Sequence, residues 1–172
     1  LSFVPALGYQ LNDKWSVGAG LSVNYSYYEL KSSVFNGINQ PDGEFELEAD
    51  DISLSFILGA VYEYSPYTRF GLRYSSESER VLSGQPDYKN VDTPRARREI
   101  KVSSTFPQSI VVGTFHEFQD RSWVTADFAW IDFSEFGISE FRIGSSSVET
   151  QDQNFDDTWA TTIGYNHYLN DK

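Results

Sequence analysis

Alternation of apolar and polar residues is the dominant pattern along this chain, and residues 15–30 show it most clearly. Every odd position from Trp15 to Tyr27 is apolar or aromatic, whereas the even positions up to residue 26 are Ser, Gly or Asn. Tyr28 alone departs from this division. A period of two residues predicts a β-strand with one apolar face and one face of small, polar residues.

The same alternation recurs and predicts about seven strands. They cover residues 1–11, 15–28, 51–64, 69–80, 100–118, 123–130 and 159–169. Gln108 falls in the apolar phase beside Pro107, which predicts a local bulge or an edge at that point. The pattern as a whole predicts an all-β, antiparallel fold in which successive strands pair with one another.

The connections between these strands alternate in length. Short turns are predicted at residues 12–14, 65–68, 119–122 and 170–172, and long polar stretches cover roughly 30–50, 81–99 and 137–155. Short turns on one side and long loops on the other are typical of outer-membrane β-barrels.

Aromatic residues gather near both ends of the predicted strands. Those near the short turns are Tyr9, Trp15, Tyr62, Tyr64, Phe70, Phe118, Trp123 and Tyr165, and those near the long stretches are Tyr25, Tyr27, Tyr74, Trp130, Phe133 and Trp159. Two aromatic girdles separated by about 25 Å flank the apolar band of a transmembrane barrel. A preference of aromatic residues for strands in general is the alternative explanation.

Composition narrows the class of protein. Aromatic residues make up 16% of the 172 residues, yet mean hydropathy is −0.43 and no run of 18 apolar residues occurs. A helical membrane span is therefore excluded, whereas a strand that shows every second residue to lipid is not. The chain has no cysteine, which excludes disulfides, and its net charge of −12 argues against nucleic acid as a partner. Because its first residue is Leu, we expect a fragment or a processed product.

Several segments together resemble the FadL-type transporters of long-chain fatty acids in Gram-negative outer membranes. They are PALGYQLNDKWSVGAGLSVNY, ISLSFILGAVYEYSPYTRFGLRYSSE, STFPQSIVVGTFHEF, DFAWIDFSEF and FDDTWATTIGYNHYLNDK, in the order that the family uses. The resemblance implies an antiparallel up-and-down transmembrane β-barrel of about fourteen strands, plugged by an N-terminal hatch. Residues 1–172 would then be part of a single outer-membrane barrel domain, without the hatch and the C-terminal strands.

The resemblance also implies a function. Family members take hydrophobic molecules, above all long-chain fatty acids, from the external medium by passive diffusion and release them sideways through the barrel wall. No enzymatic step or cofactor is implied, and outer-membrane lipid and lipopolysaccharide would surround the barrel. The basic residues that bind the headgroup in some members correspond to about Tyr27 and Gln151 here, and neither is basic. An aromatic hydrocarbon is therefore the alternative ligand.

Candidate ligand-binding residues fall into an apolar and a basic group. Phe35, Ile38 and Phe45 in the first long stretch are candidates for an external hydrophobic groove, unless they pack that stretch onto its neighbours. Arg73 and Lys101 lie on the lumen side of their strands by phase.

Two further arginines, Arg97 and Arg98, lie close to Lys101 in the sequence. These basic residues could meet an acidic headgroup, or pair with lumen carboxylates such as Glu77 and Glu79.

Other polar residues have simpler explanations. The acidic residues between Asp42 and Asp51 could bind divalent cations, but a solvated acidic loop is the more common arrangement. His116 and His167 fall near short turns in the lipid-facing phase, and no serine, histidine and acid combination indicates an enzyme. We expect neither catalytic nor metal-binding residues. The alternative functions are a structural or adhesive barrel without transport, and a soluble β-sandwich or lipocalin-like binding module.

Overall fold

The computed structural model describes residues 1–91, 98–119, 121–148 and 154–167. Its elements are β1 (Ser2–Phe3), β2 (Ala6–Gln10), β3 (Trp15–Val34), β4 (Gly43–Ser65), β5 (Thr68–Ser75), β6 (Ser78–Gly84), β7 (Pro86–Lys89), β8 (Ile100–Phe106), β9 (Ser109–Glu117), β10 (Trp123–Ile131), the 3₁₀ turn η1 (Phe133–Glu135), β11 (Gly137–Ile143), β12 (Ser146–Val148) and β13 (Thr158–Asn166). In the part of the chain that is described, no helix is long and apolar enough to cross a membrane.

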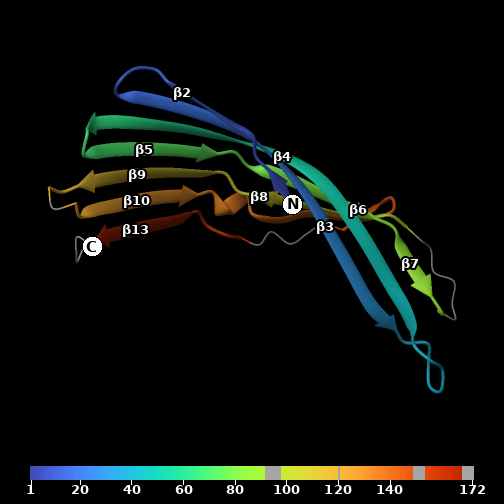
Figure 1. Cartoon of the computed structure of the whole chain (residues 1–172). Helices are drawn as coiled ribbons and strands as arrows, with labels where there is room; N and C mark the ends of the chain where they lie inside the picture. Colours follow the sequence, from blue (N-terminus) through green and yellow to red (C-terminus); the bar gives the residue numbers. More distant parts are fainter. Residues whose placement is uncertain (92–97, 120, 149–153, 168–172) are drawn as a thin grey trace.

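All of these strands belong to one antiparallel sheet (Figure 1). β3 pairs with β2 and β4, and the order continues through β5, β9 and β10 to β13. Each predicted strand is present, although residues 1–11, 69–80 and 100–118 each form two shorter strands in succession. The sheet is open and forms a single layer, whereas the soluble sandwich considered as an alternative needs two packed sheets. The antiparallel, up-and-down order is thus confirmed.

The short turns are closed by local hydrogen bonds. The Asn12 side chain accepts hydrogen bonds from the backbone N–H groups of Lys14 (2.9 Å) and Trp15 (3.0 Å). In the next turn, the Ser65 hydroxyl accepts one from the backbone N–H of Tyr67. Such side-chain bonds stabilise tight hairpins, which fixes the register of the strands that follow. The turn predicted at 170–172 lies outside the described residues.

The long connection predicted at residues 30–50 is wrong, because most of it is strand. β3 and β4 pair without interruption from Trp15↔Tyr62 to Val34↔Gly43, and only residues 35–42 connect them. The acidic residues of this stretch alternate with Phe45, Leu47 and Ala49, so that each kind occupies its own face of β4. We call residues 28–34 and 43–50, together with β7, the extension. We call the rest of β3 and β4, with the strands β2, β5, β9, β10 and β13 that follow in the order, the lower sheet. Figure 1 shows the extension projecting beyond the other strands.

Two neighbouring strands are interrupted where the extension begins. β5 passes into β6 at residues 76–77, and β8 passes into β9 at residues 107–108. The bulge or edge predicted at Gln108 coincides with this break, since Gln108 lies between β8 and β9. The Gln108 amide accepts a hydrogen bond from the Tyr74 hydroxyl (2.9 Å) and donates one to the Asp132 carboxylate (3.0 Å). These bonds hold the interrupted strands together where backbone pairing stops.

Candidate ligand-binding site

The two faces of the lower sheet differ sharply in side-chain size. The outer face is the one that carries Trp15, and its rings contact one another, as in the pairs Trp15–Tyr62 (4.7 Å between ring centroids) and Phe128–Trp159 (5.3 Å). In β3 the inner face carries the small residues that alternate with these, whereas in β9 and β10 the rings of Phe115 and Trp123 also lie on it. Cross-strand register brings its glycines side by side, with Gly18 opposite Gly59.

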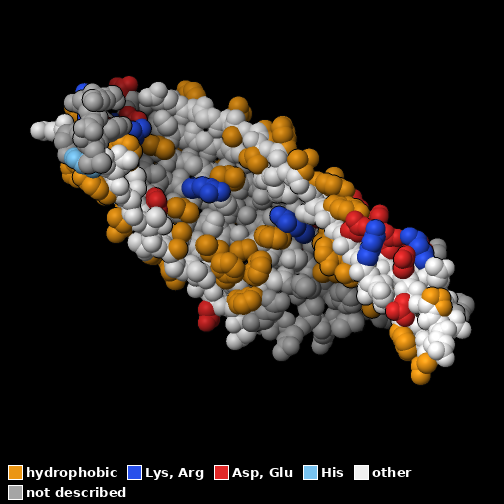
Figure 2. Space-filling model, turned by 60° about the horizontal axis from the view of Figure 1, so that its bottom comes forward, with side chains coloured by type: hydrophobic (Ala, Val, Ile, Leu, Met, Phe, Trp, Pro, Cys, Tyr) orange, Lys and Arg blue, Asp and Glu red, His pale blue; other side chains and the backbone are white. Residues whose placement is uncertain are grey.

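The small residues leave a hollow of about 490 Å³ on the inner face, across β3, β4, β5, β9 and β10. Its lining includes Gly59 and Gly71, where the absence of side chains provides the space, and Gly113, over which the Asp127 carboxylate lies. Figure 2 shows a hollowed face of the molecule, in which a few basic side chains lie among hydrophobic ones. A shallow apolar hollow of this size suits a small organic molecule or a packed peptide segment.

Arg73 lies on the inner face, as its phase predicts, and lines the hollow together with Asp127. Within the described residues Arg73 forms no ion pair, so the expected pairing with Glu77 or Glu79 is not found. Arg69, four positions earlier, places its guanidinium 4.9 Å from the centroid of the Phe115 ring. The guanidinium of Arg73 is therefore available to a ligand or to another part of the protein.

The inner face changes character in the extension, where it becomes apolar. Register places Leu30 opposite Leu47 and Tyr28 opposite Ala49, while Phe45 faces Tyr88 with ring centroids 5.4 Å apart. Leu82 of β6 and Val102 of β8 continue this surface. We call these residues, together with Ile100, the apolar lining. Leu47 and Ala49 are the buried hydrophobic residues among those described, whereas Leu30 and Tyr28 are exposed.

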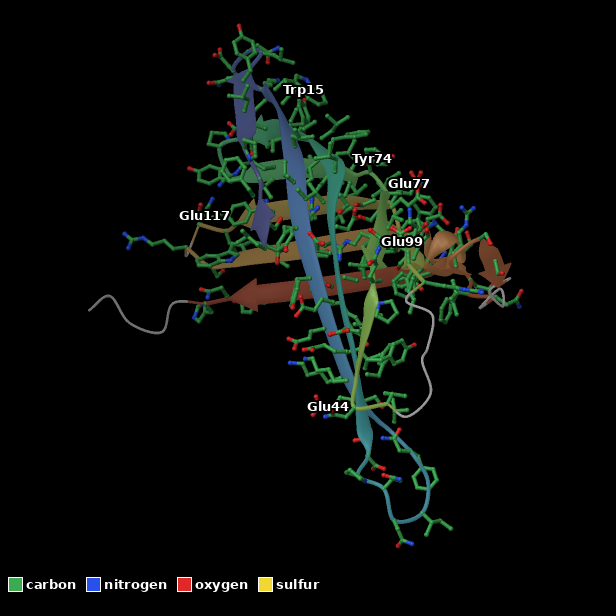
Figure 3. All side chains as sticks on the ribbon, turned by 90° about the vertical axis from the view of Figure 1, so that its right-hand side faces the viewer. Trp15, Glu44, Tyr74, Glu77, Glu99 and Glu117 are labelled. Carbon is green, nitrogen blue, oxygen red and sulfur yellow. The ribbon has the colours of Figure 1, made fainter. Side chains whose placement is uncertain are left out.

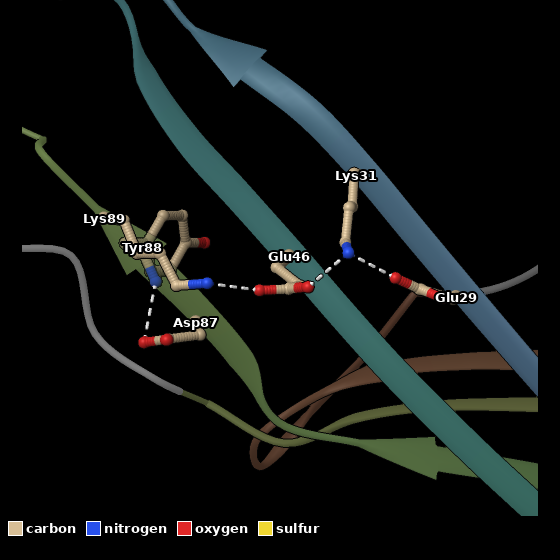
Figure 4. Close-up of polar contacts among 6 residues, drawn as sticks. All are labelled: Glu29, Lys31, Glu46, Asp87, Tyr88 and Lys89. Atoms are coloured by element: carbon tan, nitrogen blue, oxygen red, sulfur yellow. Dashed lines mark hydrogen bonds and ion pairs between the residues drawn. The ribbon is translucent and has the colours of Figure 1, made fainter.

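The outer face of the extension is charged. Lys31 lies 2.5 Å from a Glu29 carboxylate oxygen and 2.8 Å from Glu46, which Lys89 also approaches at 2.6 Å (Figure 4). Hydrogen bonds from Lys31 and then Lys89 lower the pKa of Glu46 from 4.5 to about 2. Hydrogen bonds to Glu29 and then Glu46 raise the pKa of Lys31, and the hydrogen bond to Glu46 raises the pKa of Lys89. This face is therefore built for water and ions.

The carboxylates of Glu29, Glu46 and Glu48 lie close enough together to hold a cation. Lys31 already lies between two of them, and these groups are strand residues rather than the solvated loop that we expected. The cluster therefore has a sufficient explanation in its own ion pairs. His116 lies in the outer-face phase, as predicted, and its ring nitrogen shares a hydrogen bond with Thr68 (2.9 Å).

The three apolar candidates are placed differently. Phe45 belongs to the apolar lining, but Phe35 and Ile38 lie in the connection at the tip of the extension and are 73% and 87% exposed. The two tip residues therefore do not pack that connection onto its neighbours. Figure 3 shows Trp15 and Glu44 at opposite ends of the long β3–β4 pair, with Tyr74 and Glu77 between them. Phe35 and Ile38 thus lie farther from the hollow than Phe45 does.

The prediction that Lys101 lies on the lumen side is wrong. Lys101 pairs with Ser83, which pairs with Asp50 on the outer face, so it lies on the face opposite to Arg73. The interruptions at 76–77 and 107–108 shift the alternation by one residue, and a continuous count along the sequence misses that shift. Lys101 approaches Glu99 at 3.5 Å.

Arg98 is exposed, and its aliphatic part lies beside Gly144 in the turn between β11 and β12. Arg97 lies outside the described residues. The basic candidates are thus not brought together into one site.

Sequence reasoning missed most of the apolar lining. Its first signal is Tyr28, the residue that departs from the alternation and marks the point at which the inner face becomes apolar. A second signal is the regular alternation of acidic and apolar residues over 43–50, which is a strand pattern. Leu82 and Tyr88 carry no comparable signal, because each lies in a strand too short to show a period.

Comparison with known proteins gives one family and several structures of the same fold. The family model described as "Outer membrane protein transport protein (OMPP1/FadL/TodX)" matches residues 1–172. The Ralstonia pickettii toluene transporter TbuX is 21% identical with a TM-score of 0.67, over 99% of this chain and 54% of that one. The CymD monoaromatic hydrocarbon channel is 21% identical with a TM-score of 0.66, over 96% and 55%. No curated protein sequence matches.

A third structure, a deletion mutant of the TodX monoaromatic hydrocarbon channel, is 14% identical with a TM-score of 0.61, over 98% of this chain and 50% of that one. The chain therefore spans about half the length of the solved structures that it matches. At these identities the likeness shows the fold, an outer-membrane β-barrel of which this sheet is a part.

Proposed function

Because the chain belongs to the outer-membrane transport protein family that includes FadL and TodX, we propose that it forms part of a barrel that transports hydrophobic small molecules. Residues 1–172 would be one section of a single barrel domain whose remaining strands close the sheet, since an open edge is unstable in a membrane. Transport by diffusion needs no covalent step, so the proposal includes no catalytic residue and no cofactor.

The observation that carries this proposal is the apolar lining of the extension. The outer face is apolar up to Tyr27 and charged from Glu29 onwards, which is the change expected at the upper boundary of the lipid band. The lining above this boundary is apolar on the inside, away from lipid. An apolar solute that buries on the order of 100 Å² there gains about 2.5 kcal/mol, a weak attraction that favours the lining over water.

The ligand class follows from the same surface. Phe45 and Tyr88 offer ring faces, and Leu30 and Leu47 offer aliphatic contacts, so the lining suits a one-ring aromatic compound or an acyl chain. The similar structures are described as toluene and monoaromatic hydrocarbon transporters, which favours the aromatic class. The charged outer face of the extension would contact lipopolysaccharide headgroups and their counterions.

Uptake by intact cells tests this function. We expect cells that produce the full-length protein to take up radiolabelled toluene or oleate faster than cells without its gene. Leu30→Asp places a charge on the exposed inner face and should reduce uptake about tenfold, because a carboxylate disfavours an apolar solute there. Ser33→Asp introduces the same charge on the outer face of the same strand and should leave uptake unchanged.

A correctly folded barrel whose presence makes no difference to the uptake of either compound would overturn the transport proposal. It would favour a structural or adhesive role instead.

A further inference from the structure

Two basic residues lie directly opposite each other on the outer face, where β8 and β11 pair. Lys101 pairs with Arg142 on one side and with Ser83 on the other, and Ser83 pairs with Asp50 of the outer face. Side chains directly opposite each other in an antiparallel ladder point to the same side of the sheet, with Cβ atoms about 5 Å apart. Ser83, Lys101 and Arg142 therefore form one cluster, which we call the basic row.

The basic row lies above the lipid-facing part of its strands. The outer face of β9 carries Ile110 and Val112, whereas the outer residues of β8 are Thr105, Ser103 and Lys101. The change from apolar to polar residues thus falls at the break between β8 and β9. Lys101 lies seven residues beyond Gln108, the residue at that break. At about 3.3 Å per residue and a strand tilt of about 40°, the basic row lies on the order of 18 Å above the hydrocarbon.

This height favours one kind of molecule over another. The headgroup layer of a phospholipid is roughly 5–8 Å thick, so its phosphates stay below the basic row. The row lies on the side of the sheet that carries the extension, opposite the short turns, and this side faces the exterior in outer-membrane barrels. Lipopolysaccharide fills the external leaflet of that membrane and carries phosphates on a chain of sugars, which reach farther from the hydrocarbon.

The charge pattern of the basic row differs from that of the extension. In the extension Lys31 lies between the carboxylates of Glu29 and Glu46, which match its charge (Figure 4). In the basic row two cations face each other, and like charges directly opposite destabilise a sheet. Glu99 approaches Lys101 at 3.5 Å, but both side chains are exposed, so this ion pair contributes little. An anion that contacts both cations removes their repulsion.

The side chains of the basic row offer the donors that a phosphate group needs. The guanidinium of Arg142 presents parallel N–H groups, the ammonium of Lys101 presents a compact positive charge, and the hydroxyl of Ser83 can donate a further hydrogen bond. Arg142 is exposed, and Lys101 and Ser83 are partly exposed, so a group outside the barrel can reach all three.

We propose that Lys101 and Arg142, assisted by Ser83, bind a sugar phosphate of lipopolysaccharide on the outside of the barrel. The site would anchor β8 and β11 to the external leaflet, above the hydrocarbon. It lies on the opposite face of the sheet from the hollow and the apolar lining, so it takes no part in the path of the transported molecule. It is therefore a second binding function, independent of transport.

Lipopolysaccharide with and without its phosphates tests the proposal. Full-length protein in detergent with EDTA would be titrated with rough-type lipopolysaccharide that has a complete phosphorylated core, and binding would be followed by microscale thermophoresis. Lys101→Gln and Arg142→Gln should each weaken this binding about fivefold, as expected for the loss of one basic side chain near an anionic lipid surface. Lipopolysaccharide dephosphorylated with hydrofluoric acid should bind more weakly than the intact form, and equally to the wild type and both variants.

Two control variants separate the site from charge alone and from a structural role. Lys14→Gln removes the same charge from a short turn at the other end of the strands and should change binding less than about twofold. Lys101→Arg keeps the charge and should bind as the wild type does.

Liposomes distinguish lipopolysaccharide from phospholipid as the source of the phosphate. In phosphatidylcholine liposomes, added lipopolysaccharide should raise the urea midpoint of unfolding of the wild type more than that of the variant with both Lys101→Gln and Arg142→Gln. Added phosphatidylglycerol should affect the two proteins alike, because its phosphates lie below the basic row. A phosphatidylglycerol effect that depends on these two residues would make a phospholipid the partner and overturn the proposal.

Other outcomes would also overturn it. Equal binding of intact lipopolysaccharide by the wild type and both single variants would show that the basic row is not the site. Loss of all binding in EDTA would place the contact at carboxylates bridged by divalent cations, as on the extension. Toluene uptake should stay unchanged in both variants, so the failure of this proposal and the failure of the transport proposal are separate results.

Discussion

The lower and upper parts of the β3–β4 pair follow one register but reverse their faces. Up to Tyr27, β3 carries its apolar residues outside and Gly, Ser and Asn inside; from Tyr28 onwards it carries Tyr and Leu inside and charged residues outside. β4 changes at the same level, between Ile52 and Asp50. The alternation itself continues through the change, so the medium around each part, rather than the local backbone, explains the difference.

This reversal indicates which surfaces meet lipid and water, and it separates both from the inner surface that we propose for the ligand. In the lower part lipid lies outside, and small inner residues leave room for contents of the barrel. In the extension water lies outside and holds the Lys31 and Glu46 ion pair, so apolar residues inside are there for something other than lipid. Exposed apolar surface in water is unfavourable, and a hydrophobic ligand removes that cost whenever it binds.

The largest expected effect on stability comes from a positive charge on the outer face of the lower part. The same charge on the outer face of the extension is the comparison. Leu58 lies on the outer face of β4 near the middle of the lower part, between Ala19 and Tyr74. Leu58→Arg should lower the free energy of unfolding in liposomes by about 2–4 kcal/mol, because the guanidinium would lie in the hydrocarbon layer. Unfolding in urea, followed by tryptophan fluorescence, would measure it.

Glu48→Arg is the control for this substitution on the same face of the same strand, within the extension. Register places Glu48 opposite Glu29, so the variant removes a repulsion between like charges and should stay within about 0.5 kcal/mol of the wild type. Equal losses from both substitutions would mean that the two parts share one medium, and the comparison would fail.

A second, smaller effect compares a glycine that lines the lower hollow with a glycine that packs against the extension. A methyl group at Gly71, in the lower hollow, would meet no atom within 4 Å, whereas at Gly84 it would collide with the backbone carbonyl of Glu48. Gly84→Ala should therefore cost about 1–3 kcal/mol, and Gly71→Ala should be neutral or stabilise by up to about 1 kcal/mol. Urea unfolding of the two variants side by side checks this. A stable Gly84→Ala variant would show that β6 and β4 are not as close as the structure places them.

Much of the lower part was predictable from sequence because lipid imposes a strict period of two. The strands containing Trp15, Phe70 and Trp130, the short turns and the irregularity at Gln108 all follow from that period and from turn chemistry. The family resemblance rested on the same segments and is confirmed by the family match over the whole chain.

The extension and the interrupted strands beside it were less predictable for two physical reasons. Acidic residues between Glu44 and Asp50 suggested a solvated loop, although ion pairs with Lys31 and Lys89 allow them to line one face of a strand. The interruptions at 76–77 and 107–108 shift the phase of β6 and β8, and Lys101 was assigned to the wrong face for that reason.

The smallest expected effect is a pH dependence confined to the extension. The pKa of Glu46 is lowered to about 2 by hydrogen bonds from Lys31 and then Lys89, so its contribution to stability is present above its ordinary value of 4.5 and is lost as the pH falls from there towards 2. The ammonium groups stay charged throughout this range. Because the cluster is exposed and screened by salt, the loss should be small and should affect the extension alone.

Hydrogen exchange at low pH measures this effect directly. After correction for the intrinsic exchange rate, backbone amides of residues 29–33 and 44–48 should lose protection between pH 4.5 and pH 2, whereas those of β9 and β10 should not. Glu46→Gln, which cannot ionise, should show the weaker protection at every pH in this range. If protection fell equally in the lower strands, acid would be acting on the barrel as a whole. The separation of a water-facing extension from a lipid-facing sheet would then lose its support.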